Sequence, residues 1–330
     1  MEEGVTIIGA GGIGCAIGYA LRVANIPVTF VEANPHKLTW GVAHGVGVDR
    51  CPPVAANFLS FSDWRPRSED TVILCTKCYD NARVLERVPA SATLIPIQNG
   101  FDLALEAAGV ALEGIASFIS ECDPQRTHTR ITRAGALHLG GRSSNRPSRE
   151  AAREDTIRLA QALAHAKLFH VEVVADILPY KHTKLMYNAA ISPLAAAAGL
   201  DNGQLLSIPA ARRLFFRLLR ENYTILHGAG IALEKIGPFH PRTVSRILSS
   251  NLIARALSWA FYPSLRGTYC SMHGDLPTGR TEIDFYNGYL IELAGSRPCP
   301  LNRRVYEMVK GMECARVAPG VHVLPQLEAA

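Results

Sequence analysis

The first half of the chain alternates short apolar runs with stretches of helical character. Four largely β-branched runs have the length of buried strands: Val5–Ile8, Val28–Val31, Thr71–Thr76 and Thr93–Ile97. Helical stretches, Cys15–Val23 and Asn81–Arg87, follow the first and third runs. Strands that alternate with helices predict a parallel sheet covered by helices on both faces.

The pattern continues to residue 174 with shorter elements. Residues Gly114–Gly140 predict short strands, interrupted by the polar segment Asp123–Thr129. A helix over Arg149–Ala166 and an apolar run over Phe169–Val174 then complete a first domain. The basic stretch Arg142–Arg149 lies before that helix, and we expect a solvated loop there with Ser148 as the helix N-cap.

Beyond residue 174 the long β-branched runs disappear and the apolar period becomes helical, from Pro179 to Met312. Arg212–Ala229, for example, predicts an amphipathic helix. The fold class is therefore α/β: a Rossmann-type doubly wound sheet over residues 1–174, followed by an all-α domain over residues 180–315. Residues 316–330, with two prolines and a glycine, predict an irregular tail.

A glycine-rich turn, Gly9-Ala10-Gly11-Gly12-Ile13-Gly14, lies between the first strand and the first helix. Gly9 allows a tight turn, Gly11 lets the backbone approach a pyrophosphate, and Gly14 lets the helix pack close to the strand. The helix then directs its N-terminal amides at the phosphates. Strand, glycine turn and helix in this order indicate a dinucleotide site, in preference to an ordinary tight turn.

The acid that ends the second apolar run, Glu32, bears on which dinucleotide binds. A carboxylate there accepts both ribose hydroxyls of NAD and repels the 2′-phosphate of NADP. The nearest basic residues are His36 and Lys37, which could still meet that phosphate. The cofactor is therefore NAD(P)H, and Glu32 favours NADH.

Composition narrows the class of protein. The 330 residues are 48% hydrophobic with a formal net charge of +5, which suits an anionic cofactor and substrate and does not require nucleic acid. The eight cysteines are scattered, and Cys75 and Cys78 end an apolar run without a second pair at zinc-site spacing, so we expect two half-buried thiols and no metal. Without a basic leader or a membrane-spanning run, we expect no membrane partner and a cytoplasmic protein.

A row of polar residues stands out in the helical domain. Lys184, Asn188 and Ser192 are spaced by four residues, so they lie on one face of a helix. Pro193 cannot donate to the carbonyl of Ala189, which predicts a kink and a freed acceptor. The alternative is a solvated polar stripe on a surface helix, but the segment around these residues is too apolar for that arrangement.

A second polar segment runs from Ser271 to Asp284. Its glycine, proline and threonine residues predict a loop, after which Thr281 and Glu282 open a helix. Glu282 is either a favourable acid in the first turn or a carboxylate delivered to a domain interface, and composition does not separate the two.

Taken together, these residues resemble the ketopantoate reductases (2-dehydropantoate 2-reductases). The resemblance rests on five features spread over residues 5–295: the glycine turn, Lys77, Gln98-Asn99-Gly100, the row from Lys184 to Pro193, and Ser271-Met272 followed by Thr281-Glu282-Ile283-Asp284. It implies NAD(P)H-dependent reduction of a small-molecule 2-oxo acid, most simply 2-dehydropantoate, in a cleft between a Rossmann domain and a helical domain. It also implies that Asn287-Gly288 lies inside a helix.

The resemblance implies roles for individual residues. Lys184 and Glu282 would be the two catalytic residues. Lys184 would be the general acid, and Glu282 would hold the hydroxyl side of the substrate. Substrate contacts would come from Asn188, Ser192, Ser271 and Asn99, and cofactor contacts from the glycine turn with Glu32, Lys77 and Asn99. A homodimer is possible.

Three departures from the family pattern keep alternatives open. Ser192 replaces a common asparagine, Glu32-Ala33 replaces a basic residue, and Cys270 could align in place of Ser271. The first two favour an NADH-dependent D-2-hydroxyacid dehydrogenase that acts on another branched or aromatic 2-oxo acid. A dinucleotide-sensing regulator without turnover is an alternative of another class, and Lys184 together with Glu282 counts against it.

Overall fold

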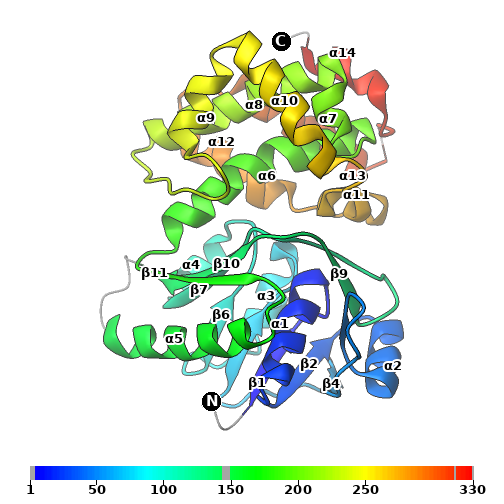
Figure 1. Ribbon diagram of the computed structural model, residues 1–330, viewed down its shortest axis with the longest axis vertical. Helices are drawn as coiled ribbons and strands as arrows, with labels where there is room; N and C mark the ends of the chain where they lie inside the picture. Colours follow the sequence, from blue (N-terminus) through cyan, green and yellow to red (C-terminus); the bar gives the residue numbers. More distant parts are fainter. Residues whose placement is uncertain (1–3, 143–148, 316, 329–330) are drawn as a thin grey trace. The chain divides into compact units, whose positions relative to one another are not determined.

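The computed structural model describes residues 4–142, 149–315 and 317–328. It divides into two compact units, Met1–Leu178 and Pro179–Ala330 (Figure 1). The first unit contains every strand of the described chain and the second contains helices only.

A five-stranded parallel sheet forms the centre of the first unit, in the order β4-β2-β1-β5-β6. Its strands are β1 (Val5–Ile8), β2 (Val28–Glu32), β4 (Asn57–Ser60), β5 (Thr71–Leu74) and β6 (Thr93–Pro96). The order reverses between β1 and β5, which pair in register with Val5 opposite Thr71. A dinucleotide binds beyond the carboxyl ends of the strands at such a switch point. The sequence predicted four of these strands and missed the edge strand β4.

Helices cover both faces of this sheet (Figure 1). They are α1 (Gly12–Val23), α2 (Pro35–His44), the 3₁₀ turn η1 (Cys78–Asp80), α3 (Asn81–Leu85), α4 (Leu103–Ala107) and α5 (Arg149–His165). Adjacent β1 residues belong to different cores, because Ile7 packs in the cluster that includes α1 and α5 while Ile8 packs in the one that includes α3 and α4. The doubly wound sheet that the alternating pattern predicted is thus confirmed.

Two smaller sheets complete the unit, in the orders β11-β10-β7 and β3-β9-β8. Their strands are β3 (Gly47–Val48), β7 (Leu112–Ala116), β8 (Ile119–Cys122), β9 (His128–Arg133), β10 (Ala136–Gly141) and β11 (His170–Val174). The hairpin β8–β9 packs against α1, since a Cβ added at Gly12 would lie 2.5 Å from Ser120 Oγ.

Helices α6 to α14 form the second unit, as the helical period predicted. They are α6 (Leu178–Ala198), α7 (Gln204–Ser207), α8 (Pro209–Gly228), α9 (Pro241–Leu248), α10 (Asn251–Leu265), α11 (Ser271–Asp275), α12 (Tyr289–Ala294), α13 (Pro300–Glu313) and α14 (Leu324–Glu328), with the short turns η2 (Leu276–Thr278), η3 (Asp284–Gly288) and η4 (Val321–Val323). Turn η3 is a π-helix, which confirms that Asn287-Gly288 lies inside a helix.

Three expectations from the sequence were wrong. The tail is not irregular throughout, because η4 and α14 bury Val323, Leu324 and Leu327. The segment after Ser271 is not a loop, because it forms α11 and η2. Arg142 is not solvated: its Nε lies 2.8 Å from Glu113 Oε2, and the two side chains are 7% and 0% exposed. The remainder of that basic stretch up to Ser148 lies outside the described residues.

We predict that Arg142→Met destabilises the first unit by about 3–5 kcal/mol, because it leaves the Glu113 carboxylate buried without its cation. The matched control is Arg130→Met, whose ion pair with Glu121 is largely exposed and is worth about 0–1 kcal/mol. Urea denaturation of both variants measures the difference. Equal midpoints would show that the buried pair contributes no more than the exposed one.

Candidate active site

The predicted cofactor residues lie along the edge of the five-stranded sheet that the carboxyl ends of its strands form. Parallel register brings the ends of β1, β2, β5 and β6 to this edge, which places the glycine turn, Glu32, Lys77 and Asn99 at the ends of four neighbouring strands. Lys77 and Asn99 are half-buried. The structure therefore brings together the predicted cofactor residues that lie in the first unit.

The glycine turn has the geometry that its three spaced glycines predicted. Gly9 has φ +95°, a conformation that favours glycine, and a Cβ on Gly14 would overlap the Gly9 carbonyl oxygen. An added Cβ at Gly11 would meet no atom within 4 Å. Gly11 is also the N-cap of α1 and provides no side-chain cap, so the first amides of α1 stay available to an anion. The turn fits a dinucleotide pyrophosphate.

The backbone N–H and the backbone carbonyl of Ala10 are both fixed by side chains. Its N–H donates to Glu32 Oε2 at 2.9 Å, and its carbonyl accepts from Lys37 Nζ at 2.8 Å. The other oxygen of Glu32, Oε1, accepts from the amides of Ala33 and Asn34, both at 2.8 Å. Lys37 is buried and directed at the turn, whereas His36 is exposed.

Side-chain amides join the loops that follow β5 and β6. Gln98 Nε2 donates to Thr76 O and to Asn81 Oδ1, each at 2.8 Å, and Asn81 Nδ2 donates back to Gln98 Oε1 at 3.1 Å. Gln98 is 4% exposed, so its role is to hold these loops together. Its neighbour Asn99 is half-buried at the same edge.

In the second unit, α6 carries the predicted polar row. Lys184 and Asn188 are half-buried and Ser192 is buried at 6% exposure, so the row is not a solvated stripe. Thr183 fixes the helix on another side, since its hydroxyl donates to Glu234 O at 2.7 Å.

The carbonyl that Pro193 leaves without its helical donor has a partner elsewhere in the chain. Asn287 Nδ2 donates to Ala189 O at 3.0 Å, which confirms the freed acceptor. Asn287 is fully buried and lies in the π-helix η3, a kind of turn that often occurs at functional sites. This hydrogen bond joins α6 directly to the segment that follows Glu282.

Further buried amides extend this connection to α8 and α13. Asn287 Nδ2 also donates to Asn302 Oδ1 at 2.9 Å, and Asn302 Nδ2 donates to Asn222 Oδ1 at 2.8 Å. Asn222 then donates to the α6 carbonyl of Met186 at 3.0 Å. Glu221 accepts from the amides of Leu301 and Asn302, at 3.2 and 2.7 Å, in the first turn of α13. Two carbonyls of α6 are thereby held by one continuous network.

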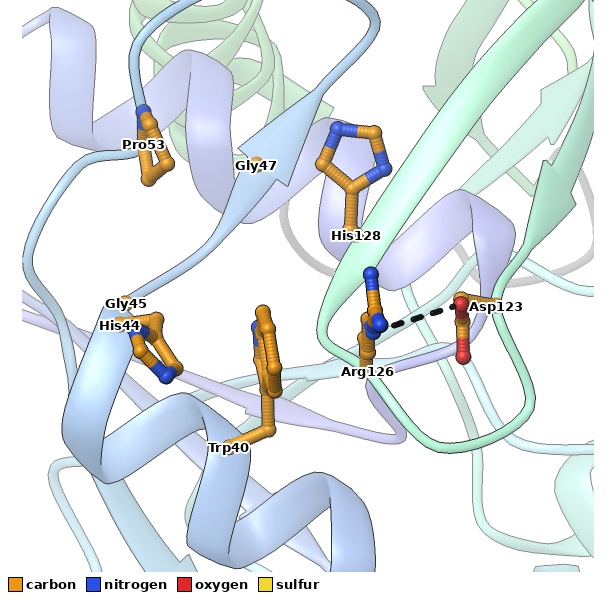
Figure 2. Close-up of a pocket in the computed structure, with 8 residues that line it drawn as sticks. All are labelled: Trp40, His44, Gly45, Gly47, Pro53, Asp123, Arg126 and His128. Carbon is orange, nitrogen blue, oxygen red and sulfur yellow. Dashed lines mark ion pairs between the residues drawn. The ribbon is translucent and has the colours of Figure 1, made fainter.

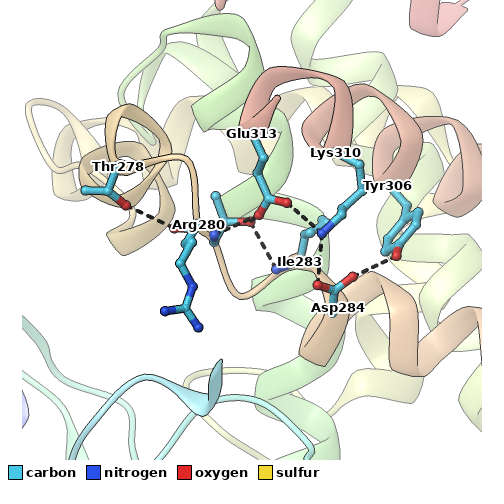
Figure 3. Close-up of polar contacts among 8 residues, drawn as sticks. Thr278, Arg280, Ile283, Asp284, Tyr306, Lys310 and Glu313 are labelled. Carbon is cyan, nitrogen blue, oxygen red and sulfur yellow. Dashed lines mark hydrogen bonds and ion pairs between the residues drawn. The ribbon is translucent and has the colours of Figure 1, made fainter. Parts of the chain in front are cut away.

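The residues around Glu282 are anchored on α13 (Figure 3). Thr281 donates through its amide and its hydroxyl to Glu313 Oε1, both at 2.7 Å, and Asp284 accepts from Tyr306 OH at 2.7 Å and from Lys310 Nζ at 3.1 Å. Lys310 also lies 2.6 Å from Glu313 Oε2. Burial alone would lower the pKa of Lys310, but its bonds to the two carboxylates raise it, so it stays a cation.

These anchors leave the side chain of Glu282 in the interior. It is 4% exposed, and one of its oxygens accepts from Tyr286 OH at 3.2 Å. A solvated acid in a first helical turn would not be buried in this way. Thr281 and Asp284 thus explain the spacing of the Thr-Glu-Ile-Asp segment: both are anchors, and Glu282 is the residue they position.

The structure separates Ser271 from Cys270. Ser271 is exposed as the first residue of α11, whereas Cys270 Sγ donates to Ser192 O at 3.3 Å. The thiol therefore contacts α6 beside the polar row.

Sequence reasoning missed the residues that position the predicted ones, namely Asn287, Asn302, Glu313, Lys310 and Tyr286. Pro193 indicated that a carbonyl would be freed, but no local signal identified a donor 98 residues away. Of the two thiols expected to be half-buried, Cys75 is half-buried, but the expectation was wrong for Cys78, which is buried.

Other features of the described residues bear on the class of protein. No group of three or more His, Cys, Asp or Glu side chains within them is placed to hold a metal ion. No helix among them is long and apolar enough to cross a membrane. A small pocket of about 240 Å³ near the end of α2 (Figure 2), lined by residues such as Trp40, Arg126 and His128, contains none of the predicted site residues.

Both halves of the chain match models of one protein family. The model described as "Ketopantoate reductase PanE/ApbA" matches residues 5–140, and its C-terminal counterpart matches residues 176–313. The chain belongs to the ketopantoate reductase family, a family of NAD(P)-dependent oxidoreductases.

Curated relatives and solved structures agree with this membership. The chain is 27% identical to a 2-dehydropantoate 2-reductase of Aquifex aeolicus, over 93% of this chain and 96% of that one. It is 24% identical to the enzyme of the same name from Halobacterium salinarum, over 93% and 97%.

Among solved structures, a D-mandelate dehydrogenase with NADH and anilino(oxo)acetate has a TM-score of 0.76 at 17% identity, over 94% of this chain and 99% of that one. A PanE/ApbA family ketopantoate reductase from Ralstonia eutropha has a TM-score of 0.72 at 21% identity, over 94% and 99%. Both have the same fold as this chain.

We predict that the glycines of the turn have separable roles. Gly14→Ala should destabilise the protein by about 1–3 kcal/mol, because its methyl group overlaps a backbone oxygen that cannot move cheaply. Gly11→Ala should fold like the wild type, since its methyl group meets nothing within 4 Å, yet weaken dinucleotide binding by roughly tenfold or more, about 1.4 kcal/mol. Denaturation and fluorescence titration with NADH test the pair. Wild-type affinity in Gly11→Ala would contradict the assigned approach of the pyrophosphate.

Proposed function

We propose that this chain reduces a 2-oxo acid to the 2-hydroxy acid with a nicotinamide dinucleotide, and that its substrate is 2-dehydropantoate. The observation that carries the proposal is the hydrogen bond from Asn287 to Ala189 O, which joins the helix of the polar row to the segment that follows the buried Glu282, in a chain whose two halves both match the ketopantoate reductase family. Relatives named 2-dehydropantoate 2-reductase, aligned over most of their length, support this substrate.

The dinucleotide would be held by residues of the first unit. Ala10, Gly11, Gly12 and Ile13 provide the turn and the first amides of α1, which bind the pyrophosphate. Lys77 and Asn99, at the ends of the neighbouring strands, contact the cofactor farther along the edge. When bound, the dinucleotide supplies the hydride, and the protein supplies orientation and a proton.

Lys184 is the general acid in this proposal. Negative charge builds on the carbonyl oxygen of the substrate as it is reduced, and an ammonium group both stabilises that charge and donates the proton. Such a positioned acid contributes roughly 10²- to 10⁴-fold to the rate. A neighbouring carboxylate favours the charged form of a lysine, which is the role we give to Glu282 together with its contact to the hydroxyl side of the substrate.

The remaining polar groups would orient the substrate. Asn188 and Ser192 follow Lys184 along the same face of α6, Ser271 begins α11, and Asn99 belongs to the first unit. The side chain of Ser192 is shorter than the asparagine that is common at this position, so it leaves more room for the substrate.

That room, together with Glu32, favours a second candidate within the same reaction class. An NADH-dependent D-2-hydroxyacid dehydrogenase acting on a larger branched or aromatic 2-oxo acid would use the same general acid and the same turn. Because a D-mandelate dehydrogenase shares the fold, the fold does not decide between the substrates. Turnover with a panel of 2-oxo acids does, and a complete lack of turnover with intact dinucleotide binding would favour the regulator instead.

We propose NADH as the preferred cofactor. Glu32 lies at the turn with both carboxylate oxygens bound to backbone amides, so its charge is fixed where the adenosine ribose passes. Lys37, the nearby cation that could have neutralised a 2′-phosphate, instead donates to Ala10 O and is buried. An exposed His36 is the remaining basic group of this segment.

We also propose that the protein is a homodimer. Helix α10 exposes Leu252 and Trp259, at 82% and 79%, with Ile253 at 52%. Apolar side chains gathered on one exposed helix are typical of an interaction surface. The solved ketopantoate reductase of Staphylococcus aureus is described as dimeric, and sedimentation velocity would test the same state here.

For the general acid, we predict that Lys184→Ala lowers kcat by about 10²- to 10⁴-fold while the affinity for NADH stays unchanged. The control is Lys235→Ala, which removes an exposed lysine of the same unit and should leave kcat as in the wild type. Stopped-flow absorbance at the nicotinamide band follows the chemical step. A Lys184→Ala enzyme with near-normal kcat would remove this lysine from the mechanism.

For the cofactor, we predict a kcat/KM with NADH equal to or above that with NADPH. Glu32→Gln should shift the ratio toward NADPH, because it removes the charge while its one amide oxygen can still accept from the amides of Ala33 and Asn34. His36→Ala, which changes a basic residue of the same segment, is the comparison variant. A wild-type preference for NADPH of tenfold or more, roughly 1.4 kcal/mol, would overturn the assignment.

A further inference from the structure

The carbonyl oxygen of Ala10 is shared by three side-chain donors. Lys37 Nζ lies 2.8 Å from it, and the thiols of Cys15 and Cys122 donate to it at 3.3 and 3.4 Å. Lys37 Nζ also lies 3.2 Å from Cys122 Sγ. Two thiols and one ammonium group therefore converge on a single atom of the glycine turn.

Contacts outside the turn fix this arrangement. Cys122 ends β8, and the connection from β8 to β9 is held on α2 by the Arg126 guanidinium, 4.6 Å above the Trp40 ring (Figure 2). Asn34 Nδ2 donates to Pro124 O at 3.1 Å in the same connection. Cys122 is thus held next to Lys37 by α2, which contributes its N-cap Asn34 and, from its middle, Trp40.

The two thiols have opposite properties. Cys122 is half-buried, and the hydrogen bond from Cys15 together with the charge of Lys37 lowers the pKa of its thiol to about 7, against burial and the nearby Asp123. Cys15 is fully buried, and its bond to Cys122, its burial and the charge of Glu32 raise the pKa of its thiol. Cys122 is therefore the more acidic thiol of the pair and Cys15 the less acidic one.

We propose that Cys122 and Cys15 are a peroxide-sensitive pair that closes to an intramolecular disulfide at the dinucleotide turn. A thiolate, rather than a thiol, is the nucleophile that a peroxide oxidises. The positions of the two residues match the two roles that such chemistry needs, a half-buried attacking thiol and a fully buried resolving thiol.

The chemistry balances with hydrogen peroxide as the oxidant. The Cys122 thiol first loses its proton, and its sulfur then attacks one peroxide oxygen. The O–O bond breaks, a sulfenic acid forms, and the leaving hydroxide takes up that proton as the first water. The Cys15 sulfur then attacks Cys122 Sγ; the S–S bond forms, the S–O bond breaks, and the Cys15 proton leaves with the hydroxide as a second water. The two thiols together lose two electrons, and these electrons reduce one hydrogen peroxide to two waters. A dithiol reverses the step.

The disulfide changes the turn, because a disulfide has no S–H. Ala10 O loses two of its three donors and keeps only Lys37. This consequence rests on the proposed function, in which the dinucleotide binds at the turn. Loss of such hydrogen bonds should raise the Kd for NADH by about three- to tenfold.

The test begins with the reduced full-length protein and hydrogen peroxide at stoichiometric concentration, followed by alkylation of the remaining thiols and peptide mapping without reductant. We expect a Cys15–Cys122 linked peptide pair that dithiothreitol removes. Cys122→Ser should abolish the pair. Cys314→Ser, which changes an exposed cysteine, should leave it intact. Oxidation of Cys51 or Cys314 ahead of Cys122, or oxidation of Cys122 without the linked pair, would overturn the proposal.

Two further measurements separate the thiol pair from its surroundings. Lys37→Met should slow alkylation of Cys122 at neutral pH and move the midpoint of its pH dependence upward, whereas an unchanged midpoint would contradict the role of Lys37. Cys15→Ser, if folded by circular dichroism, should leave a trappable sulfenic acid on Cys122. Titration with NADH before and after oxidation then measures how the disulfide changes the Kd for NADH. Absence of binding in the reduced protein would count against the proposed function, whereas the linked peptides report on the thiols alone.

Discussion

The hydrogen bond from Asn287 to Ala189 O is the contact on which the candidate site in the second unit depends. Pro193 removes the donor that this carbonyl would have in an ordinary helix, and a buried carbonyl without a partner is costly. The side-chain amide that replaces it belongs to the π-helix that follows Glu282. One bond therefore joins the helix that carries Lys184, Asn188 and Ser192 to the segment that carries the buried carboxylate. The same amide leaves its own oxygen without a partner among the described residues, a cost that a position with a purely packing role would avoid.

A comparable constraint operates at the glycine turn of the first unit. The peptide of Ala10 is held by Glu32 at its N–H and by Lys37 and two thiols at its carbonyl. In the proposed cofactor preference, Glu32 would serve two purposes, because the carboxylate that fixes the turn would also be the charge that selects against a 2′-phosphate. Lys37 also holds the turn, because its ammonium group donates to the carbonyl of Ala10. Under that proposal cofactor preference and turn geometry are coupled, because a substitution of Glu32 also removes a hydrogen bond that holds the turn.

The parts of the fold that the sequence predicted are those that depend on local pattern. The β-branched runs and the glycine turn predicted β1, β2, β5 and β6 closely, and the spacing of Lys184, Asn188 and Ser192 predicted one helical face. The parts that were missed depend on partners distant in sequence. Arg142 looked solvated because its partner Glu113 belongs to another strand, and the segment after Ser271 looked like a loop although its glycine and proline lie in short helical turns. Even where Pro193 predicted a free carbonyl, only the tertiary structure could show that Asn287 satisfies it.

A double-mutant cycle between Asn287 and Pro193 tests this central connection most directly. Asn287→Leu removes the side-chain donor, and Pro193→Ala supplies a backbone N–H that can reach Ala189 O from within α6. We expect Asn287→Leu alone to lower the free energy of unfolding by about 1–3 kcal/mol and to reduce kcat. The double variant should recover part of both losses, with a coupling energy of about 0.5 kcal/mol or more. Strictly additive effects on stability and on kcat would show that this carbonyl does not link the two halves of the site.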